Sequence, residues 1–302
     1  MTDTTTNQGP QFKARLVRMT SSLWSAKRRD QQVTREVNEA HGTANAGRFI
    51  KSLLVGDTKE YDDLKTALNT ARADHYFHTL KWDTGVQLLP TKNSPAYNEA
   101  RRRNVVAFED TRRAFLAAYD RLVDNARRPA IDGGLGDLFN EKDYPHSDRI
   151  ADRISLEFEN LAVPAAGDFR VEGLGQEEVE NIRAEIDARV RLATGAAMEN
   201  AKARLGAVVG KMADTLARQK GDKGFGFKDT LVENIRAEVE VLKSLNLTDD
   251  DGLESFRKVV EDELTKEEAD TLRNDPSKRS AMARKAAEIQ KKMGGAYGGG
   301  AK

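Results

Sequence analysis

The sequence predicts a mainly α-helical protein, arranged as an elongated helical bundle or coiled-coil hairpin with a small two-stranded β insertion. From Val179 to Leu216, apolar residues recur at steps of three and four, with a helical mean spacing of about 3.7. The composition is 38% hydrophobic, 6% aromatic and 32% charged, with a mean hydropathy of −0.66, which favours long amphipathic helices over a thick core. Ile154, Leu156 and Phe158 alternate with polar residues, which is typical of a half-buried strand.

Helices account for most of the first half of the chain. Residues 1–10 are polar and end in Gly-Pro, so we expect a disordered lead. Apolar residues at helical spacing predict one helix over 11–40 and a short one over 48–54. Capping residues and a proline at a first helical position predict further helices over 57–79 and 94–128.

The second half is expected to contain the β insertion and the longest helix. Two extended pieces, 154–158 and 168–173, can pair as a hairpin that rests on the helix after it. The expected organisation is a lead (1–10), a main helical domain (11–220) with the insertion near 154–172, a helical C-terminal region (228–293) and a flexible glycine-rich tail (294–302).

The apolar stripe of the long helix is the predicted helix-packing interface, because alanines near its middle allow a partner helix to approach closely. The partner is a second copy of the chain, another protein, or the helix predicted over 94–128. The interface residues are Val179, Ile182, Ile186, Val190, Ala193, Ala197, Ala201 and Leu205.

Composition also excludes several chemistries. The chain has no cysteine, which excludes disulfides, thiolate metal sites and a cysteine nucleophile. It has no apolar run of the ~20 residues that span a bilayer and no signal-peptide pattern at its start. We therefore expect a protein of the cytoplasm that does not associate with membranes.

The formal net charge of zero conceals three charged zones. Residues 11–35 have seven basic and one acidic residue, residues 277–302 likewise have seven and one, and residues 229–275 have 15 acidic and six basic. Basic ends can bind a polyanion, but opposite zones can also pair with each other within or between molecules.

Two basic clusters are candidate contacts for nucleic acid, since arginine and lysine neutralise phosphates and an aromatic ring can stack on a base. Alternatively, the interleaved carboxylates of Glu99, Glu109, Asp110 and Asp120 pair with these arginines along the helix. The candidate contacts are Trp24, Lys27, Arg28, Arg29, Arg101, Arg102, Arg103, Arg112 and Arg113.

One histidine pair could bind a metal ion. His75 and His78 are three residues apart on a predicted helix, with Asp74 adjacent and Asp83 nearby. A metalloenzyme or hydrolase built on these residues is a third functional hypothesis. It ranks below the other two, because the sequence shows no motif for a third metal ligand. No catalytic, cofactor-binding or metal-binding residue is assigned.

Four ordered blocks between residues 11 and 215 resemble a family of bacteriophage and prophage proteins of unknown function. They are "LWSAKRRDQQVTREVNEAHG" with "AGRFIKSLL" shortly after it, "ARADHYFHTLKWDTGVQLLP", "LFNEKDYP" and "VPAAGDFRVEGLGQEEVENIRAEIDARV". The resemblance implies a phage-encoded protein in the host cytoplasm. The genes of some relatives lie near genes for a MoxR-type ATPase and a von Willebrand factor A protein. This arrangement implies that the protein is an adaptor or a substrate of the ATPase machinery. The resemblance implies no catalytic residue.

The sequence thus favours a non-enzymatic helical interaction or scaffold protein that forms a homo-oligomer or binds another phage protein. The alternative is a single-stranded nucleic-acid-binding protein for phage replication or recombination. A clustered cationic face would favour the alternative, and arginines scattered among carboxylates would favour the scaffold.

Overall fold

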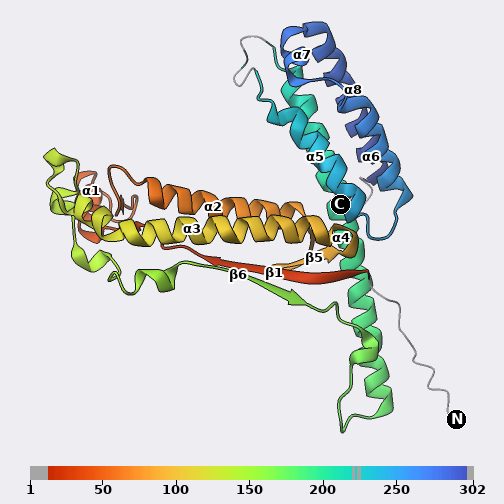
Figure 1. Cartoon of the computed structure of the whole chain (residues 1–302), viewed down its shortest axis with the longest axis horizontal. Coiled ribbons are helices and arrows are strands. Elements are labelled where there is room, and N and C mark those ends of the chain that lie inside the picture. The colour runs from red at the N-terminus through yellow and green to blue at the C-terminus, as the bar shows by residue number, and fades with distance from the viewer. Residues whose placement is uncertain (1–12, 220–221, 223–225, 298–302) are drawn as a thin grey trace. The chain divides into compact units, whose positions relative to one another are not determined.

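The protein is mainly α-helical, as predicted. The computed structural model describes residues 13–219, 222 and 226–297, and it is 65% helical, with eight α-helices and two small antiparallel sheets in this part of the chain (Figure 1). In the same part, no helix combines the length and apolar character needed to cross a membrane. The chain divides into two compact units: unit 1 comprises Met1–Arg18, His75–Tyr97 and Glu159–Lys302, and unit 2 comprises Met19–Asp74 and Asn98–Phe158.

Unit 2 is built on two long helices, α2 (Lys59–Phe77) and α3 (Ser94–Arg127), each of which has one end in unit 1. The apolar face of α2 packs on that of α3 through residues that include Leu64, Leu68 and Phe108. The same core includes residues that flank a two-stranded sheet of β2 (Lys27–Arg29) and β3 (Ile50–Ser52), which are connected by α1 (Gln31–Ala40).

The centre of the unit 2 core is aromatic. The ring of Trp24 meets those of Tyr61, Tyr119 and Tyr144 at centroid distances of 5.7 to 6.4 Å. The Tyr119 hydroxyl donates to the carbonyl of Pro145 at 2.7 Å. Burial raises the pKa of Tyr119 and of Tyr144 to about 12, so both phenols remain protonated donors at neutral pH.

The larger sheet has the strand order β4-β5-β1-β6. Unit 1 contains the hairpin of β4 (Leu80–Asp83) and β5 (Val86–Pro90), whose turn uses Gly85 at a φ of 72° that favours glycine. The last two strands in this order, β1 (Ala14–Ser22) and β6 (Ser155–Leu161), continue from one unit into the other. Leu16 pairs with Leu88 in the register between β1 and β5.

The helical part of unit 1 is organised on α4 (Gln176–Ala217). Its C-terminal half packs on α5 (Thr230–Leu245) and on α8 (Pro276–Tyr297), and α6 (Asp251–Leu264) and α7 (Ala269–Asn274) complete the group (Figure 1). The approach of α4 to α8 is close at Gly210, where a Cβ atom would lie 2.4 Å from the Gln290 amide nitrogen.

Three of the predicted helices are confirmed: 57–79 as α2, 94–128 as α3 and the long apolar run as α4. The helix predicted over 11–40 is wrong, because this segment contains the strands β1 and β2, and only its last part, α1, is an α-helix. On β1, Leu16 faces the unit 1 core while its neighbour Val17 packs with Leu89 on the other side. In a strand that is buried on both faces, apolar and polar residues do not alternate, so the spacing of its apolar residues resembled that of a helix.

The short helix predicted over 48–54 is also wrong, since these residues include β3, which is held by its pairing with β2. The predicted two-stranded insertion is wrong in its pairing. Its first piece is β6, an edge strand of the four-stranded sheet, while its second piece, 168–173, begins at the end of a 3-10 turn, Ala166–Asp168, and contains no strand. Long-range pairing decided these segments, which local spacing could not reveal.

The two predicted ends fall mostly outside the described residues. The lead, 1–10, lies outside them entirely, as does 298–302. The predicted tail begins later than expected, because α8 continues through Tyr297. The structural units are discontinuous in sequence, with the C-terminal helices in the same unit as α4.

Candidate functional site

The three basic residues of β2 point to two different sides of the β2–β3 ribbon. Arg28 pairs across the ribbon with Lys51, and both reach the carboxylate of Asp143, at 3.5 and 2.9 Å. Lys27 and Arg29 are exposed and form no ion pair with a described residue. Since alternate residues of a strand face opposite sides, this cluster offers two free cations rather than three.

Trp24 is not available as an exposed stacking platform. Its side chain is 8% exposed, and its ring is enclosed by the three tyrosines of the unit 2 core. The prediction that it stacks on a base is therefore corrected, because its apolar surface stabilises the protein's own core.

The five candidate arginines of α3 do not form one cationic face. Arg101 and Arg112 are eleven residues, about three turns, apart and share one side, whereas Arg102 and Arg113 share another. On the first side, Arg101 covers the ring of Phe158 at 4.9 Å, and Arg112 donates to the carbonyls of Ala151 and Ile154. These two guanidiniums therefore bind groups of the protein itself and are not available to a nucleic acid.

The remaining arginines of this set are mixed with carboxylates. Arg113 lies 3.4 Å from Asp110, and Arg103 lies 3.4 Å from Asp74. Arg102 alone of the five is exposed with no ion pair to a described residue. Such a surface has little net potential to attract a polyanion.

The opposite charge zones of the sequence pair with each other inside unit 1. Lys278 on α8 reaches Glu267 at 3.2 Å, and Lys285 forms an ion pair with Glu263 of α6. Within the acidic stretch itself, Arg236 on α5 binds Glu268 at 2.8 Å. The acidic stretch and part of the basic C-terminal stretch thus neutralise each other within the molecule.

The predicted packing stripe of α4 divides into two parts. Ala197, Ala201 and Leu205 are fully buried in the unit 1 core, so they are an intramolecular interface. Val179, Ile182, Ile186, Val190 and Ala193 are only half-buried, and no residue of α4 before Ala197 is buried.

The N-terminal half of α4 is covered mainly by the segment that precedes it, and it touches β4 where Arg189 reaches Asp83 at 3.3 Å. Arg183 donates to the carbonyl of Phe169 in this segment at 3.2 Å, and the segment lies alongside this half of the helix in Figure 1. Leu192 remains 77% exposed and Val171 50% exposed. An apolar stripe with so thin a cover is typical of a surface that receives a partner.

The candidate metal ligands do not form a site. The His75 ring nitrogen lies 3.0 Å from the Tyr97 hydroxyl, the His78 ring nitrogen faces the amide of Asn93 at 3.5 Å, and Asp83 pairs with Arg189 at 3.3 Å. The Asp74 carboxylate accepts a hydrogen bond from Asn104. Among the described residues, no group of three or more histidine or carboxylate side chains could hold a metal ion.

His75 is instead a buried neutral side chain. It is 3% exposed, and burial lowers its pKa to about 4 from the ordinary 6.5. Because the unfolded chain takes up a proton near pH 6.5 and the folded chain only near pH 4, stability should fall as the pH drops through this window. The loss for one group is about 3 kcal/mol in total.

The variant His75→Asn removes this titration while it keeps a side chain that can hydrogen-bond to Tyr97. The slope of unfolding free energy against pH between 6.5 and 4 should be shallower in the variant than in the wild type, by up to about 1.4 kcal/mol per pH unit. Urea denaturation at half-unit pH steps measures it, with pH 8 as the reference where His75 is neutral in both states. Equal slopes in the two proteins would contradict a buried neutral His75.

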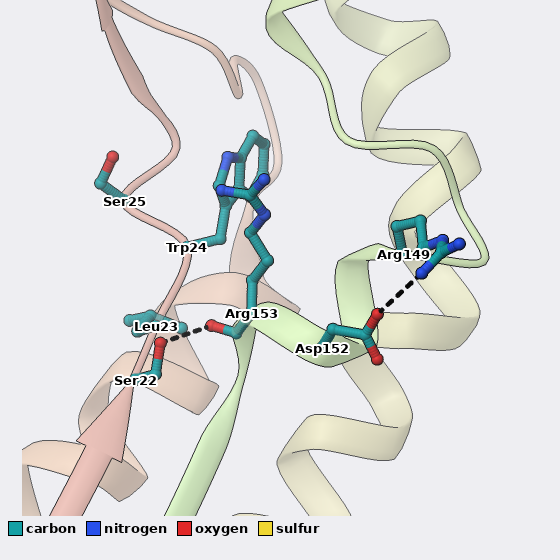
Figure 2. Close-up of a pocket in the computed structure, with 7 residues that line it drawn as sticks. All are labelled: Ser22, Leu23, Trp24, Ser25, Arg149, Asp152 and Arg153. Carbon is teal, nitrogen blue, oxygen red and sulfur yellow. Dashed lines mark hydrogen bonds and ion pairs between the residues drawn. The ribbon is translucent and has the colours of Figure 1, made fainter.

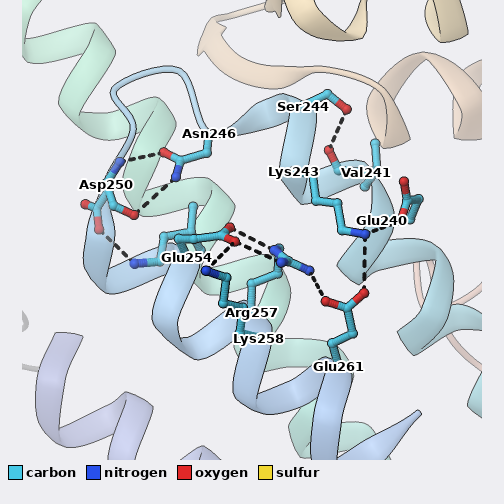
Figure 3. A network of polar contacts seen from close by, with 11 residues as sticks. Glu240, Val241, Lys243, Ser244, Asn246, Asp250, Glu254, Arg257, Lys258 and Glu261 are labelled. Carbon is cyan, nitrogen blue, oxygen red and sulfur yellow. Dashed lines mark hydrogen bonds and ion pairs between the residues drawn. The ribbon is translucent and has the colours of Figure 1, made fainter. Parts of the chain in front are cut away.

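The sequence analysis missed several basic side chains that each bind two or more partners within the protein. One is Arg257, which is 4% exposed and binds Glu254 and Glu261 on its own helix at 2.7 to 2.9 Å, while Lys243 of α5 reaches Glu261 at 3.3 Å (Figure 3). The spacing of these three α6 residues, three and four apart, could have revealed these contacts. Lys51 and Arg204 have partners far away in sequence, and no local signal could have found them.

The Arg257 network has the properties of a structural element. Hydrogen bonds from Arg257 lower the pKa of Glu254 and of Glu261, so both carboxylates stay charged at neutral pH. A guanidinium with two charged partners has no proton to exchange and no free donor edge to offer a substrate. The network joins α5 to α6 and brings no catalytic group together.

In comparisons with known proteins, no family model matches the chain, and no curated protein or solved structure is similar to it. The functional argument therefore depends on the geometry of this chain. Its most distinctive surface is the half-buried stripe on the N-terminal half of α4.

Proposed function

We propose that the protein is a non-enzymatic helical interaction protein that self-associates through the N-terminal half of α4. The observation that carries the proposal is the stripe of Val179, Ile182, Ile186, Val190 and Ala193, which no other described helix buries. A helix of 42 residues that packs over only its C-terminal half leaves an apolar face for a second molecule.

The spacing of the stripe favours a second copy in antiparallel orientation. Its steps of three, four, four and three residues read the same in both directions from Ile186. A two-fold axis at Ile186 would pair this residue with its own copy, Ile182 with Val190, and Val179 with Ala193. Isologous dimers need this kind of self-complementary pattern.

The charges beside the stripe are complementary in the same arrangement. Glu185, Arg189 and Leu192 are spaced by four and three residues and share one flank of the stripe. In the antiparallel pair, Glu185 of one copy would lie near Arg189 of the other, twice per dimer, where it would share Arg189 with Asp83, which Arg189 reaches at 3.3 Å within its own chain. A parallel pair would instead place this flank against the opposite flank of its partner, so Glu185 and Arg189 would not meet.

Substitution of Ile186 by aspartate is expected to abolish self-association, because it buries two like charges at the axis. Mass photometry and sedimentation equilibrium of the full chain would measure the change from dimer to monomer. Val106→Asp is the matched control, since Val106 is 61% exposed on α3 in unit 2, and it should leave the dimer intact. A monomeric wild type at micromolar concentration, or a dimeric Ile186→Asp, would refute the proposal.

Charge reversal tests the orientation. Glu185→Arg and Arg189→Glu should each weaken the homodimer, while a mixture of the two variants, or a chain with both changes, should recover it. Recovery in the mixture identifies antiparallel pairing. If the doubly changed chain remains as weak as the single variants, the antiparallel arrangement is wrong.

The proposed setting is the host cytoplasm during phage infection, on the strength of the resemblance in the four sequence blocks. In that setting, a MoxR-type ATPase assembly is a candidate partner for the dimer. The nucleic-acid alternative has less support, since Arg101, Arg103, Arg112 and Arg113 are engaged with ring, carbonyl or carboxylate groups of the chain itself.

A further inference from the structure

Unit 2 contains an open cavity of about 650 Å³ that has no part in the proposed self-association (Figure 2). One wall is the segment Ser22–Ser25, which follows β1, and the other is the 3-10 turn Ile150–Arg153 with Arg149 before it. All of its lining residues belong to the same unit.

The first wall is rigid and locally strained. Trp24 is held by the tyrosine rings around it, and its carbonyl accepts a hydrogen bond from Tyr61 at 2.8 Å. Two residues later, Ala26 has a φ of 50°, a left-handed conformation that costs free energy in a residue other than glycine. Such strain is retained where the chain must present neighbouring groups in a fixed position.

The second wall is fixed to the rest of unit 2. Ile150 and Ile154 are buried, and the guanidinium of Arg112 on α3 binds the carbonyls of Ala151 and Ile154. The Ser22 hydroxyl joins the two walls, since it donates to the carbonyl of Arg153 at 3.0 Å. The cavity is therefore formed before any ligand arrives.

The donors of this cavity exceed its acceptors. Arg153 forms no ion pair with a described residue, and Arg149 lies 3.8 Å from Asp152, which is beyond hydrogen-bond distance. The indole N–H of Trp24, whose side chain is 8% exposed, donates to no residue that the structure describes. The guanidinium of Arg153 lies beside the Trp24 ring, and Arg149 extends from the far side of the turn, beyond Asp152 (Figure 2). Guanidinium and indole N–H donors of this kind can bind an oxyanion.

We propose that this cavity binds the carboxylate side chains of an acidic peptide segment on a partner protein. A guanidinium pairs with a carboxylate through two parallel hydrogen bonds, which two arginines on one short turn can offer to successive acidic residues. The cavity is open and polar, unlike the enclosed apolar sites that surround small molecules. Asp152 also lines the cavity and competes for the guanidiniums, so the number of acidic groups that the cavity can bind is small.

Trp24 provides the readout. The chain has two tryptophans, so Trp82→Phe leaves Trp24, which lines the cavity, as the sole tryptophan, and excitation at 295 nm avoids the tyrosines. In this background, a hexaglutamate peptide should change the Trp24 emission saturably at low salt, and a hexalysine peptide should not. Inorganic phosphate and a single-stranded oligonucleotide are the further probes.

The variant Arg149→Gln/Arg153→Gln is expected to weaken hexaglutamate binding about tenfold or more, because charge-assisted hydrogen bonds are lost. Arg102→Gln, which removes an exposed arginine of the same unit outside the cavity, should leave binding unchanged. Asp152→Asn should tighten it, since the competing carboxylate is neutralised.

Three results would overturn the proposal: no saturable response to hexaglutamate, equal binding by the double variant and the wild type, or tighter arginine-dependent binding of the oligonucleotide. The last would assign the cavity to nucleic acid. Circular dichroism of the double variant shows whether unit 2 is still folded, and self-association through α4 is scored separately by mass photometry.

Discussion

Substitution of Arg204 by methionine is expected to lower the free energy of unfolding of unit 1 by about 4 kcal/mol. The guanidinium of Arg204, on α4, donates to the carbonyls of Phe77 at 2.8 Å and of Thr79 at 3.0 Å, and it pairs with Glu238 of α5 at 2.9 Å. It therefore caps the C-terminal end of α2, where carbonyls lack partners within the helix and carry partial negative charge.

The size of this effect comes from what the substitution leaves behind. The Glu238 side chain is 8% exposed, so without Arg204 a carboxylate would stay buried without a compensating charge. The double variant Arg204→Met/Glu238→Gln removes that charge and should recover a large part of the loss. If Arg204→Met lowers the free energy of unfolding by less than about 1 kcal/mol, the contacts of Arg204 contribute no more than a surface ion pair does.

Each unit contains one tryptophan, Trp82 in unit 1 and Trp24 in unit 2, which allows their unfolding to be followed separately. Labelling with 5-fluorotryptophan should give two fluorine resonances, and the Trp82→Phe variant assigns them. Urea titration of the labelled protein then reports the stability of unit 1 and unit 2 in one experiment. For Arg204→Met, the midpoint of the Trp82 signal should move, while that of the Trp24 signal should change less.

Substitution of Lys51 by methionine is expected to lower the free energy of unfolding of unit 2 by about 3 kcal/mol. The Lys51 side chain is 5% exposed, and its three ammonium donors reach Asp143 at 2.9 Å, Asp30 at 3.1 Å and the Leu138 carbonyl at 2.7 Å. Burial opposes the charge of Lys51, but hydrogen bonds to Asp143 and Asp30 prevail and raise its pKa.

Loss of Lys51 therefore leaves two partly buried carboxylates close together, one of which, Asp30, also caps α1. Lys59→Met is the matched control, because Lys59 is 73% exposed in an i,i+4 pair with Asp63 on α2 of the same unit. It should leave the Trp24 midpoint nearly unchanged. Equal shifts in the two variants would show that burial of Lys51 adds nothing to its ion pairs.

Local patterns were sufficient for elements whose stability comes mainly from one periodic face. The α4 stripe, the capped start of α3 and the alternation at β6 each identified an element within a few residues of its observed bounds. The same stripe identified the proposed self-association surface, because the apolar residues that do not enter the core are as regular as those that do. The charge pattern also suggested that the acidic stretch pairs with a basic stretch of the same chain, since opposite charges within one compact unit attract each other.

Only the tertiary structure decided the secondary structure and the contacts of residues whose neighbours come from distant parts of the chain. β1 imitated a helix because the sheet buries both of its faces, and the residues after β6 form no second strand because β6 pairs elsewhere. Trp24 and Arg112 looked like nucleic-acid contacts until the fold placed one in an aromatic core and the other on backbone carbonyls. The sequence by itself determined the long helices α2, α3 and α4, whose apolar faces are regular, since a helix closes its hydrogen bonds locally. Strand pairing, burial and the partner of each charge depend on contacts between residues far apart in the chain, so they were decided by the fold.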